Sequence, residues 1–206
     1  CKKWYDCILY AVFIIFLDKT ANSRTAEAII AMLIVIHLLS IIMQRNWFHK
    51  MMVLFTSGAF LLCVGIPFIG SYLYIHKPEL FLQHDGTMLS RIQLTTTFYL
   101  RNGGFGFYGF PIEDQDCLDM MFSYIGLHWG TAAFIIISAA IIYAIYKASR
   151  EQHTSFLILL FFFLVYGWAE VAPIYPVYSY LSLLLGYYIM NRKPFYCKRP
   201  YTCANF

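Results

Sequence analysis

Long apolar stretches alternate with short polar ones along the whole chain. The apolar runs cover about 4–17, 25–43, 51–75, 119–146, 155–172 and 176–190. A helix that crosses a bilayer needs about 20 apolar residues at a rise of about 1.5 Å each, and the second to fifth runs meet that length. The first and last runs are shorter, but Pro173 and Pro176 leave a tight link that favours a helical hairpin. The pattern predicts an all-α polytopic transmembrane bundle of about six spans.

The composition agrees with this prediction. Of the residues, 60% are hydrophobic and only 13% are charged, whereas soluble domains are about a quarter charged. One core of a soluble chain of this size could not bury so much apolar surface. The chain opens with Cys1 rather than Met, so we expect it to be a piece of a longer protein with earlier spans. A signal peptide fits poorly, because no small-residue cleavage site follows the first run.

Basic residues in the short connections predict the orientation, since cytoplasmic loops carry an excess of Lys and Arg. They occur at the N-terminus, in 44–50, after the fourth run and in the tail, 191–206. Even numbers of spans separate these places, so all four can be cytoplasmic, with both ends of the chain inside. The net charge of +4 is thus explained by topology rather than by nucleic-acid binding. We expect one membrane domain, 1–206, with outer connections at 18–24, 76–118 and 173–175.

The outer loop 76–118 has a pattern of its own. Its residues 87–100 predict a short amphipathic helix that lies on the membrane surface or docks into the bundle; the apolar members are Met88, Ile92, Leu94, Phe98 and Tyr99. Four glycines follow, which permit a tight loop against other backbone; they are Gly103, Gly104, Gly106 and Gly109. No strand precedes these glycines, so they are not a nucleotide-binding fingerprint.

Four charged residues are expected at the outer ends of different helices. Arg24 precedes the second run, Arg91 lies in the loop helix, Asp119 begins the fourth run and Glu170 ends the fifth. An arginine at the positive end of a helix suits a bound anion. An acid there complements the helix dipole, which explains Asp119 equally well. An acid at membrane depth costs roughly 2.5–3.5 kcal/mol, so Glu170 should have a partner. Together they predict a site with arginines for phosphate and a carboxylate base.

Three further residues are weaker candidates for this site. Asp116 and Arg101 lie in the same outer loop, and His128 lies about two and a half turns into the fourth run. A lone histidine in such a place is more often a hydrogen-bonded interior residue than a catalyst. The six cysteines show no zinc spacing and no disulfide framework, so no metal is expected.

Three stretches resemble the Wzy-type repeat-unit polymerases of O-antigen, capsule and exopolysaccharide synthesis. They are NSRTAEAII; SRIQLTTTFYLRNGGFGFYGF with the following DQDCLDMMFSYIGLHWG; and YGWAEVAPIYPVYSYLSLLLG. The likeness covers about 18–190 in the family's order. In the family the acidic residue is usually followed by Asn and an aromatic residue. Here the run is Asp116-Cys117-Leu118-Asp119, so either aspartate can be the match. The spacing from Arg91 to the glycines is not a strict family repeat.

The resemblance implies transfer of a growing glycan from undecaprenyl diphosphate to a lipid-linked repeat unit, at the outer face of the bacterial cytoplasmic membrane. Arg24 and Arg91 would neutralise the diphosphate leaving group without a metal or cofactor. Asp119 or Glu170 would deprotonate the acceptor hydroxyl. The expected partners are the bilayer, the lipid-linked oligosaccharide, a chain-length regulator and a flippase. The alternatives are an O-antigen ligase, a polysaccharide transporter or flippase with charges near mid-membrane, and a scaffold without chemistry.

Overall fold

The computed structural model describes residues 24–79, 87–112, 118, 120–169, 185–186 and 188–190. Within these ranges every regular element is a helix, and no strand occurs. The elements are α2 (Arg24–Ile42), α3 (Arg45–His76), α5 (Thr87–Arg101), α6 (Met121–Tyr124), the π-helix η1 (Ile125–Trp129), α7 (Thr131–Arg150) and α8 (Thr154–Ala169). The all-α prediction is confirmed for the described part of the chain.

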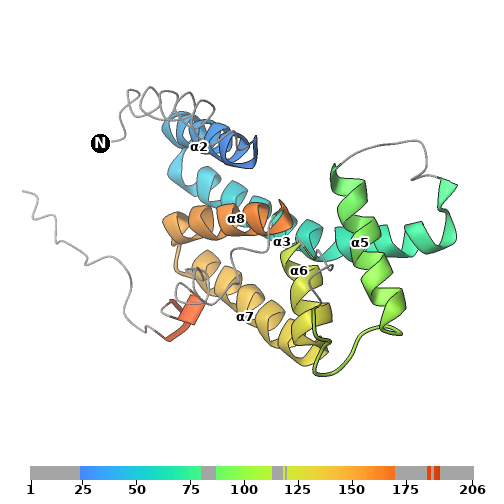
Figure 1. The fold of residues 1–206 in the computed structure, drawn as a ribbon. Helices are drawn as coiled ribbons and strands as arrows, with labels where there is room; N and C mark the ends of the chain where they lie inside the picture. Colours follow the sequence, from blue (N-terminus) through green and yellow to red (C-terminus); the bar gives the residue numbers. More distant parts are fainter. Residues whose placement is uncertain are drawn as a thin grey trace, which may run out of the picture.

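Helix α3 is the central element. Figure 1 shows α8 alongside its first half and α5 crossing its second half. The hydroxyl of Thr56 on α3 donates to the carbonyl of Met52 at 2.7 Å and to that of Leu157 on α8 at 3.1 Å. Two turns further on in both helices, Cys63 Sγ donates to the Leu164 carbonyl at 2.9 Å. These bonds hold α3 and α8 side by side over two turns.

Two described helices, α3 with 32 residues and α7 with 20, are long and apolar enough to cross a membrane. The apolar parts of two others are shorter, at Ala31–Ile42 in α2 and Thr154–Gly167 in α8. Helix α3 begins at Arg45, so most of the expected 44–50 connection is helical. The expected first span, the 173–175 connection and most of the sixth span lie outside the described residues.

The start of α3 and the α7–α8 turn lie at one end of the bundle. The His49 ring bonds the Thr154 hydroxyl through Nδ1 at 3.0 Å and the Ser149 carbonyl through Nε2 at 3.2 Å. Lys147 donates to the Tyr188 carbonyl at 2.7 Å, which brings residues 188–190 to the same end. Two of the expected basic connections, around 45–50 and 147–150, are therefore neighbours.

The fourth apolar run is not one continuous helix, contrary to expectation. Helices α6 and η1 end at Gly130, whose φ of 93° is a conformation that favours glycine, and α7 then leaves at an angle to them (Figure 1). The amides at the start of α7 donate to carbonyls of the loop with the four glycines, 103–109, which we call the glycine loop. Thr131 N donates to Gly106 O at 3.0 Å, and Ala132 N donates to Phe107 O at 3.4 Å. The loop thus caps α7, which begins 12 residues later than expected.

Candidate functional site

The predicted amphipathic helix exists as α5 and docks onto α3 rather than lying free. Gly70 of α3 provides the space, because a Cβ there would lie 2.8 Å from Cδ1 of Ile92. Ile92 and Phe98 are buried as expected, but Leu94 is 41% exposed and Thr95 and Thr96 are buried in its place. The buried positions are therefore 92, 95, 96 and 98, with Tyr99 half-buried beside them, and they include the two threonine hydroxyls.

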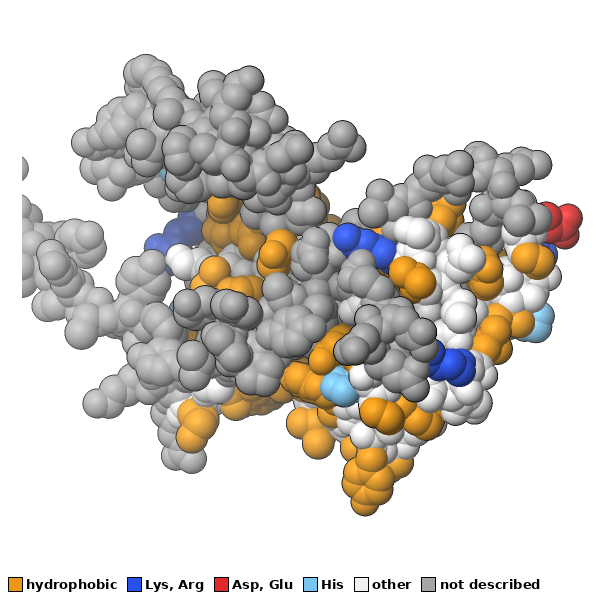
Figure 2. Space-filling model, viewed as in Figure 1, with side chains coloured by type: hydrophobic (Ala, Val, Ile, Leu, Met, Phe, Trp, Pro, Cys, Tyr) orange, Lys and Arg blue, Asp and Glu red, His pale blue; other side chains and the backbone are white. Residues whose placement is uncertain are grey.

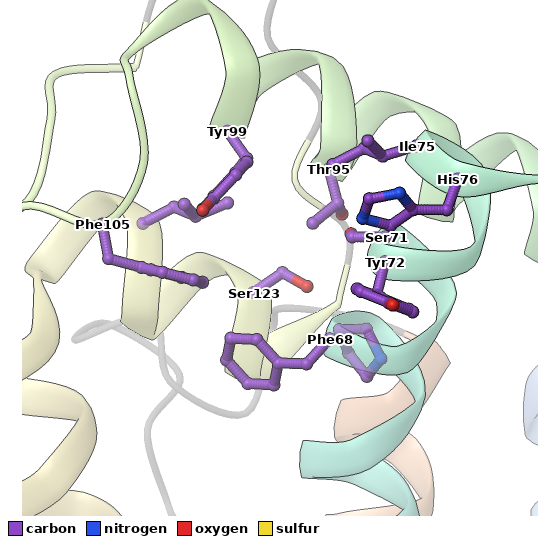
Figure 3. Close-up of a pocket in the computed structure, with 11 residues that line it drawn as sticks. Phe68, Ser71, Tyr72, Ile75, His76, Thr95, Tyr99, Phe105 and Ser123 are labelled. Carbon is purple, nitrogen blue, oxygen red and sulfur yellow. The ribbon is translucent and has the colours of Figure 1, made fainter.

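A cavity of about 250 Å³ lies between the second half of α3, α5, the glycine loop and the α6–η1 segment. Figure 3 shows its labelled residues: Ser71, Tyr72 and His76 come from α3, Thr95 and Tyr99 from α5, Phe105 from the loop and Ser123 from α6. We call this cavity the α3–α5 pocket. It is built by the predicted outer loop and the broken start of the fourth apolar run, both folded against α3.

Two buried hydroxyls form the floor of the α3–α5 pocket. Thr95 is 5% exposed and Ser123 is 2% exposed, and neither Oγ atom has a hydrogen-bond partner in the structure described. The neighbouring buried hydroxyl of Thr96, by contrast, donates to the Ile92 carbonyl at 2.7 Å. Leaving a buried hydroxyl unpaired costs about 1–3 kcal/mol. A polar molecule in the pocket would remove this cost, because buried polar groups are nearly always paired in native proteins.

Aromatic side chains form the rim of the α3–α5 pocket. The Tyr72 and His76 rings are 4.4 Å apart on one side. On the other, the Phe105 ring lies 5.2 Å from that of Phe68 and 5.0 Å from that of Tyr99. None of the described lining residues is Lys, Arg, Asp or Glu. The rim therefore offers apolar ring faces, while the floor offers hydroxyls, to a ligand without charge.

Arg91, on α5, shares a helix face with one of the residues that line this pocket. It precedes Thr95 by four residues on α5, which places both on one face of the helix. Arg91 is partly buried. Arg101 lies at the far end of α5, exposed, with its guanidinium carbon 5.2 Å from the Phe98 ring centre. Of the two loop arginines, Arg91 is thus the better placed to bind a group that projects from the pocket.

His128 forms a hydrogen bond with the residue that follows the glycine loop. Its Nδ1 lies 2.8 Å from the Phe110 carbonyl and its ring lies 4.8 Å from that of Tyr124. It is not among the residues that line the pocket. This agrees with the interior hydrogen-bonding role expected for a lone histidine.

The other predicted site residues fall largely outside what the structure describes. Arg24 begins α2, but its side chain lies outside the described set. Asp116, Asp119 and Glu170 lie outside the described residues altogether. In the described ranges no three His, Cys, Asp or Glu side chains form a group that could hold a metal ion. The predicted grouping of arginines and carboxylates therefore stays a prediction.

The sequence reasoning missed Thr95 and Ser123. A signal was present for the first of them, because the run Thr95–Thr96–Thr97 lies in the middle of an amphipathic helix, where threonines at helical spacing from Ile92 must share the buried face. No comparable signal marks Ser123, whose position depends on the fold of α6 against α3. Compared with protein-family models, with curated proteins and with solved structures, the chain matches none of them.

Proposed function

We propose that this chain, with about six spans, is the C-terminal part of a polysaccharide repeat-unit polymerase. The enzyme transfers a growing glycan from undecaprenyl diphosphate to a lipid-linked repeat unit at the outer face of the bacterial cytoplasmic membrane. One observation supports this most: a docked loop helix carries Arg91 one turn from a neutral pocket lined by hydroxyls and aromatic rings. A cation beside such a pocket suits a ligand in which phosphate is joined to a sugar.

The surface of the two long helices supports a lipid environment. Only 33% of the apolar window of α3 and 22% of that of α7 is buried inside the protein, whereas the core helix of a soluble protein would be mostly buried. Figure 2 shows hydrophobic side chains gathered on the lower part of the visible surface, in the region of α7 and the loop that follows α5. Exposed apolar surface of this extent is favourable in lipid and costly in water.

The position of the pocket along α3 fits the proposed topology. From His49 at the basic end to Tyr72 at the pocket, the helix rises roughly 35 Å at 1.5 Å per residue. The hydrocarbon core of a bilayer is about 30 Å thick. With the basic end in the cytoplasm, the pocket then opens near the outer surface, where the lipid-linked substrates are held.

The proposed reaction is a displacement at the anomeric carbon of the growing glycan. The acceptor hydroxyl oxygen forms the new glycosidic bond, and the bond from the anomeric carbon to the diphosphate oxygen breaks. The acceptor proton passes to a carboxylate, for which Asp119 and Glu170 are the first candidates and Asp116 a weaker one. Arg91 and Arg24 stabilise the negative charge that develops on the leaving diphosphate.

The proposal is tested in cells by replacing single arginines. The gene is deleted, and variants of the full-length protein are expressed from a plasmid at matched levels. Arg91→Ala should leave single repeat units on the lipid carrier, because the leaving group is no longer neutralised. Arg45→Ala, exposed at the basic end, is the matched control and should give normal polymer. Normal polymer length in the Arg91→Ala strain would disprove the assignment.

The same experiment separates the polymerase from its nearest rival. Loss of a ligase leaves full-length polymer on the lipid carrier, because only the final transfer to a different acceptor is blocked. Loss of a polymerase leaves single repeat units. The length of the glycan that accumulates on the carrier therefore distinguishes the two enzymes.

A further inference from the structure

The floor of the α3–α5 pocket has unused hydrogen-bonding capacity. Thr95 on α5 and Ser123 on α6 are each more than nine-tenths buried, and in the structure described neither hydroxyl has a partner. Figure 3 shows both side chains directed into the same space from different elements. Thr96, the next residue of α5, instead bonds the carbonyl four residues before it. The two floor hydroxyls are thus available to a molecule in the pocket.

The size and charge of the pocket restrict that molecule. A volume of about 250 Å³ lies below the roughly 300–1,000 Å³ of pockets that hold drug-sized ligands, so one ring fits. The described lining contains no Lys, Arg, Asp or Glu to pair with a charge. An alkyl chain would fill the space but leave both hydroxyls unpaired. A pyranose ring matches both surfaces, because its hydroxyls can pair with the floor and its C–H faces can pack against Tyr99 and Phe105.

We propose that the α3–α5 pocket binds one neutral pyranose ring, the sugar joined directly to the carrier diphosphate. Thr95 and Ser123 bind its hydroxyls, and Arg91, one helical turn or about 5.4 Å from Thr95, binds the adjoining phosphate. This inference rests on the proposed function, since it names the part of the substrate that each group receives. It makes the α3–α5 pocket a specificity-determining subsite, because hydroxyls at fixed positions discriminate among sugar stereoisomers.

Binding of simple sugars tests the pocket without any turnover. The full-length protein is reconstituted in phospholipid nanodiscs, because maltoside detergents themselves carry sugar rings. Methyl glycosides of glucose, galactose, mannose, rhamnose, N-acetylglucosamine and N-acetylgalactosamine are titrated, with binding followed by saturation-transfer NMR. At least one should bind to the wild type. Thr95→Val and Ser123→Ala should each raise its dissociation constant by about tenfold.

Matched controls exist for both substitutions. Thr96→Val removes an equally buried hydroxyl from the same helix outside the pocket. Ser138→Ala removes a second unpaired buried serine hydroxyl, on α7, which does not line the pocket. Both should leave the dissociation constant within about twofold. Equal weakening by pocket and control variants would overturn the inference.

A substitution at the exposed rim tests the pocket even if the variants of the buried floor residues do not fold. Phe105 is 44% exposed and lines the pocket, whereas Phe107, two residues later, is 64% exposed and does not. Phe105→Ala should weaken glycoside binding, and Phe107→Ala should not. If neither changes binding, the sugar does not lie against this rim and the inference fails.

The last arm separates this inference from the proposed function. The best glycoside is prepared with a geranyl diphosphate in place of its methyl group. Arg91→Ala should weaken binding of this compound and leave the methyl glycoside unaffected. If no glycoside binds while wild-type protein still polymerises its substrate, the subsite is disproved and the proposed function stands. If glycosides bind through Thr95 and Ser123 but Arg91→Ala has no effect on the diphosphate compound, the subsite stands and the role of Arg91 is disproved.

Discussion

Gly109, in the loop after α5, and Gly130, between η1 and α7, lie backbone against backbone. A Cβ atom on Gly109 would overlap the His128 carbonyl and lie 2.6 Å from the amide nitrogen of Gly130. A Cβ on Gly130 would overlap the Gly109 nitrogen and the Phe107 carbonyl. Both residues also have positive φ, at 76° and 93°. This contact fixes the loop that forms one wall of the α3–α5 pocket.

Gly109→Ala should destabilise the protein and disrupt the pocket. The left-handed conformation alone costs an L-residue about 1–2 kcal/mol, and the overlap is with backbone, which cannot rotate away. We expect the thermal unfolding midpoint of the protein in nanodiscs to fall by several degrees, with loss of polymer in cells.

Gly58→Ala on α3 is the control for this substitution, because nothing lies within 4 Å of its Cβ position. It should leave the midpoint unchanged or raise it slightly, since alanine favours a helix over glycine by about 1 kcal/mol. Equal effects of the two alanines would show that the backbone contact between Gly109 and Gly130 does not stabilise the fold.

Labelling of single cysteines tests whether α7 crosses a membrane. The six native cysteines are replaced, and a cysteine is introduced at Tyr108, which is 87% exposed, or at exposed Ser155 in the first turn of α8. A membrane-impermeant maleimide should label Tyr108→Cys in intact spheroplasts and Ser155→Cys only after the membrane is permeabilised. Labelling of both positions in intact spheroplasts would contradict the proposed topology.

Tyr188→Phe should lower stability without changing polymer length. The Tyr188 hydroxyl lies 3.2 Å from the Glu151 carboxylate and 3.1 Å from Nδ1 of the buried His153, so its removal takes a hydrogen bond from these groups, at a cost of about 1 kcal/mol. The readout is the midpoint of thermal unfolding. Tyr143→Phe, at an exposed position on α7, should not shift it. A change in polymer length with Tyr188→Phe would mean that this end of the bundle acts on the site.

The loop helix and the glycine loop were the best predicted parts of the structure. The expected helix at about 87–100 and the observed α5, Thr87–Arg101, agree because the amphipathic pattern is local and specifies the helix by itself. The expectation that the glycines permit close backbone contact is confirmed at Gly109. What the loop contacts could not be predicted, because Gly130 lies 21 residues further along the chain.

The fourth apolar run shows why hydropathy alone misplaces helix boundaries. Its residues from Met120 to Ile137 are mostly apolar, so hydropathy does not separate η1 from α7. The break depends on Gly130 and on loop carbonyls that replace the missing intrahelical bonds. A glycine inside an apolar run is compatible with a continuous helix as well as with a break, and only the contact with Gly109 decides between them.

The candidate site was predicted from charge, whereas the described pocket is neutral. Arginines and acids at helix ends are conspicuous in an apolar sequence, so the sequence proposes Arg91 as a site residue. Thr95 and Ser123 are not proposed by it, because a hydroxyl becomes informative only when burial and missing partners are known. The sequence thus points to the charged residues of the proposed reaction, and the structure adds a neutral cavity with two unpaired hydroxyls.

The central claim is that the protein polymerises lipid-linked repeat units with Arg91 at the leaving diphosphate. It is tested most directly by incubating the purified full-length protein, in nanodiscs, with purified lipid-linked repeat units and no other protein, and separating the glycans by length. Wild-type protein should produce a ladder of lengths, and Arg91→Ala should slow its appearance by about 100-fold or more. Arg101→Ala should have little effect. A wild-type protein that is folded but forms no ladder, or an Arg91→Ala protein as fast as wild type, would contradict the account.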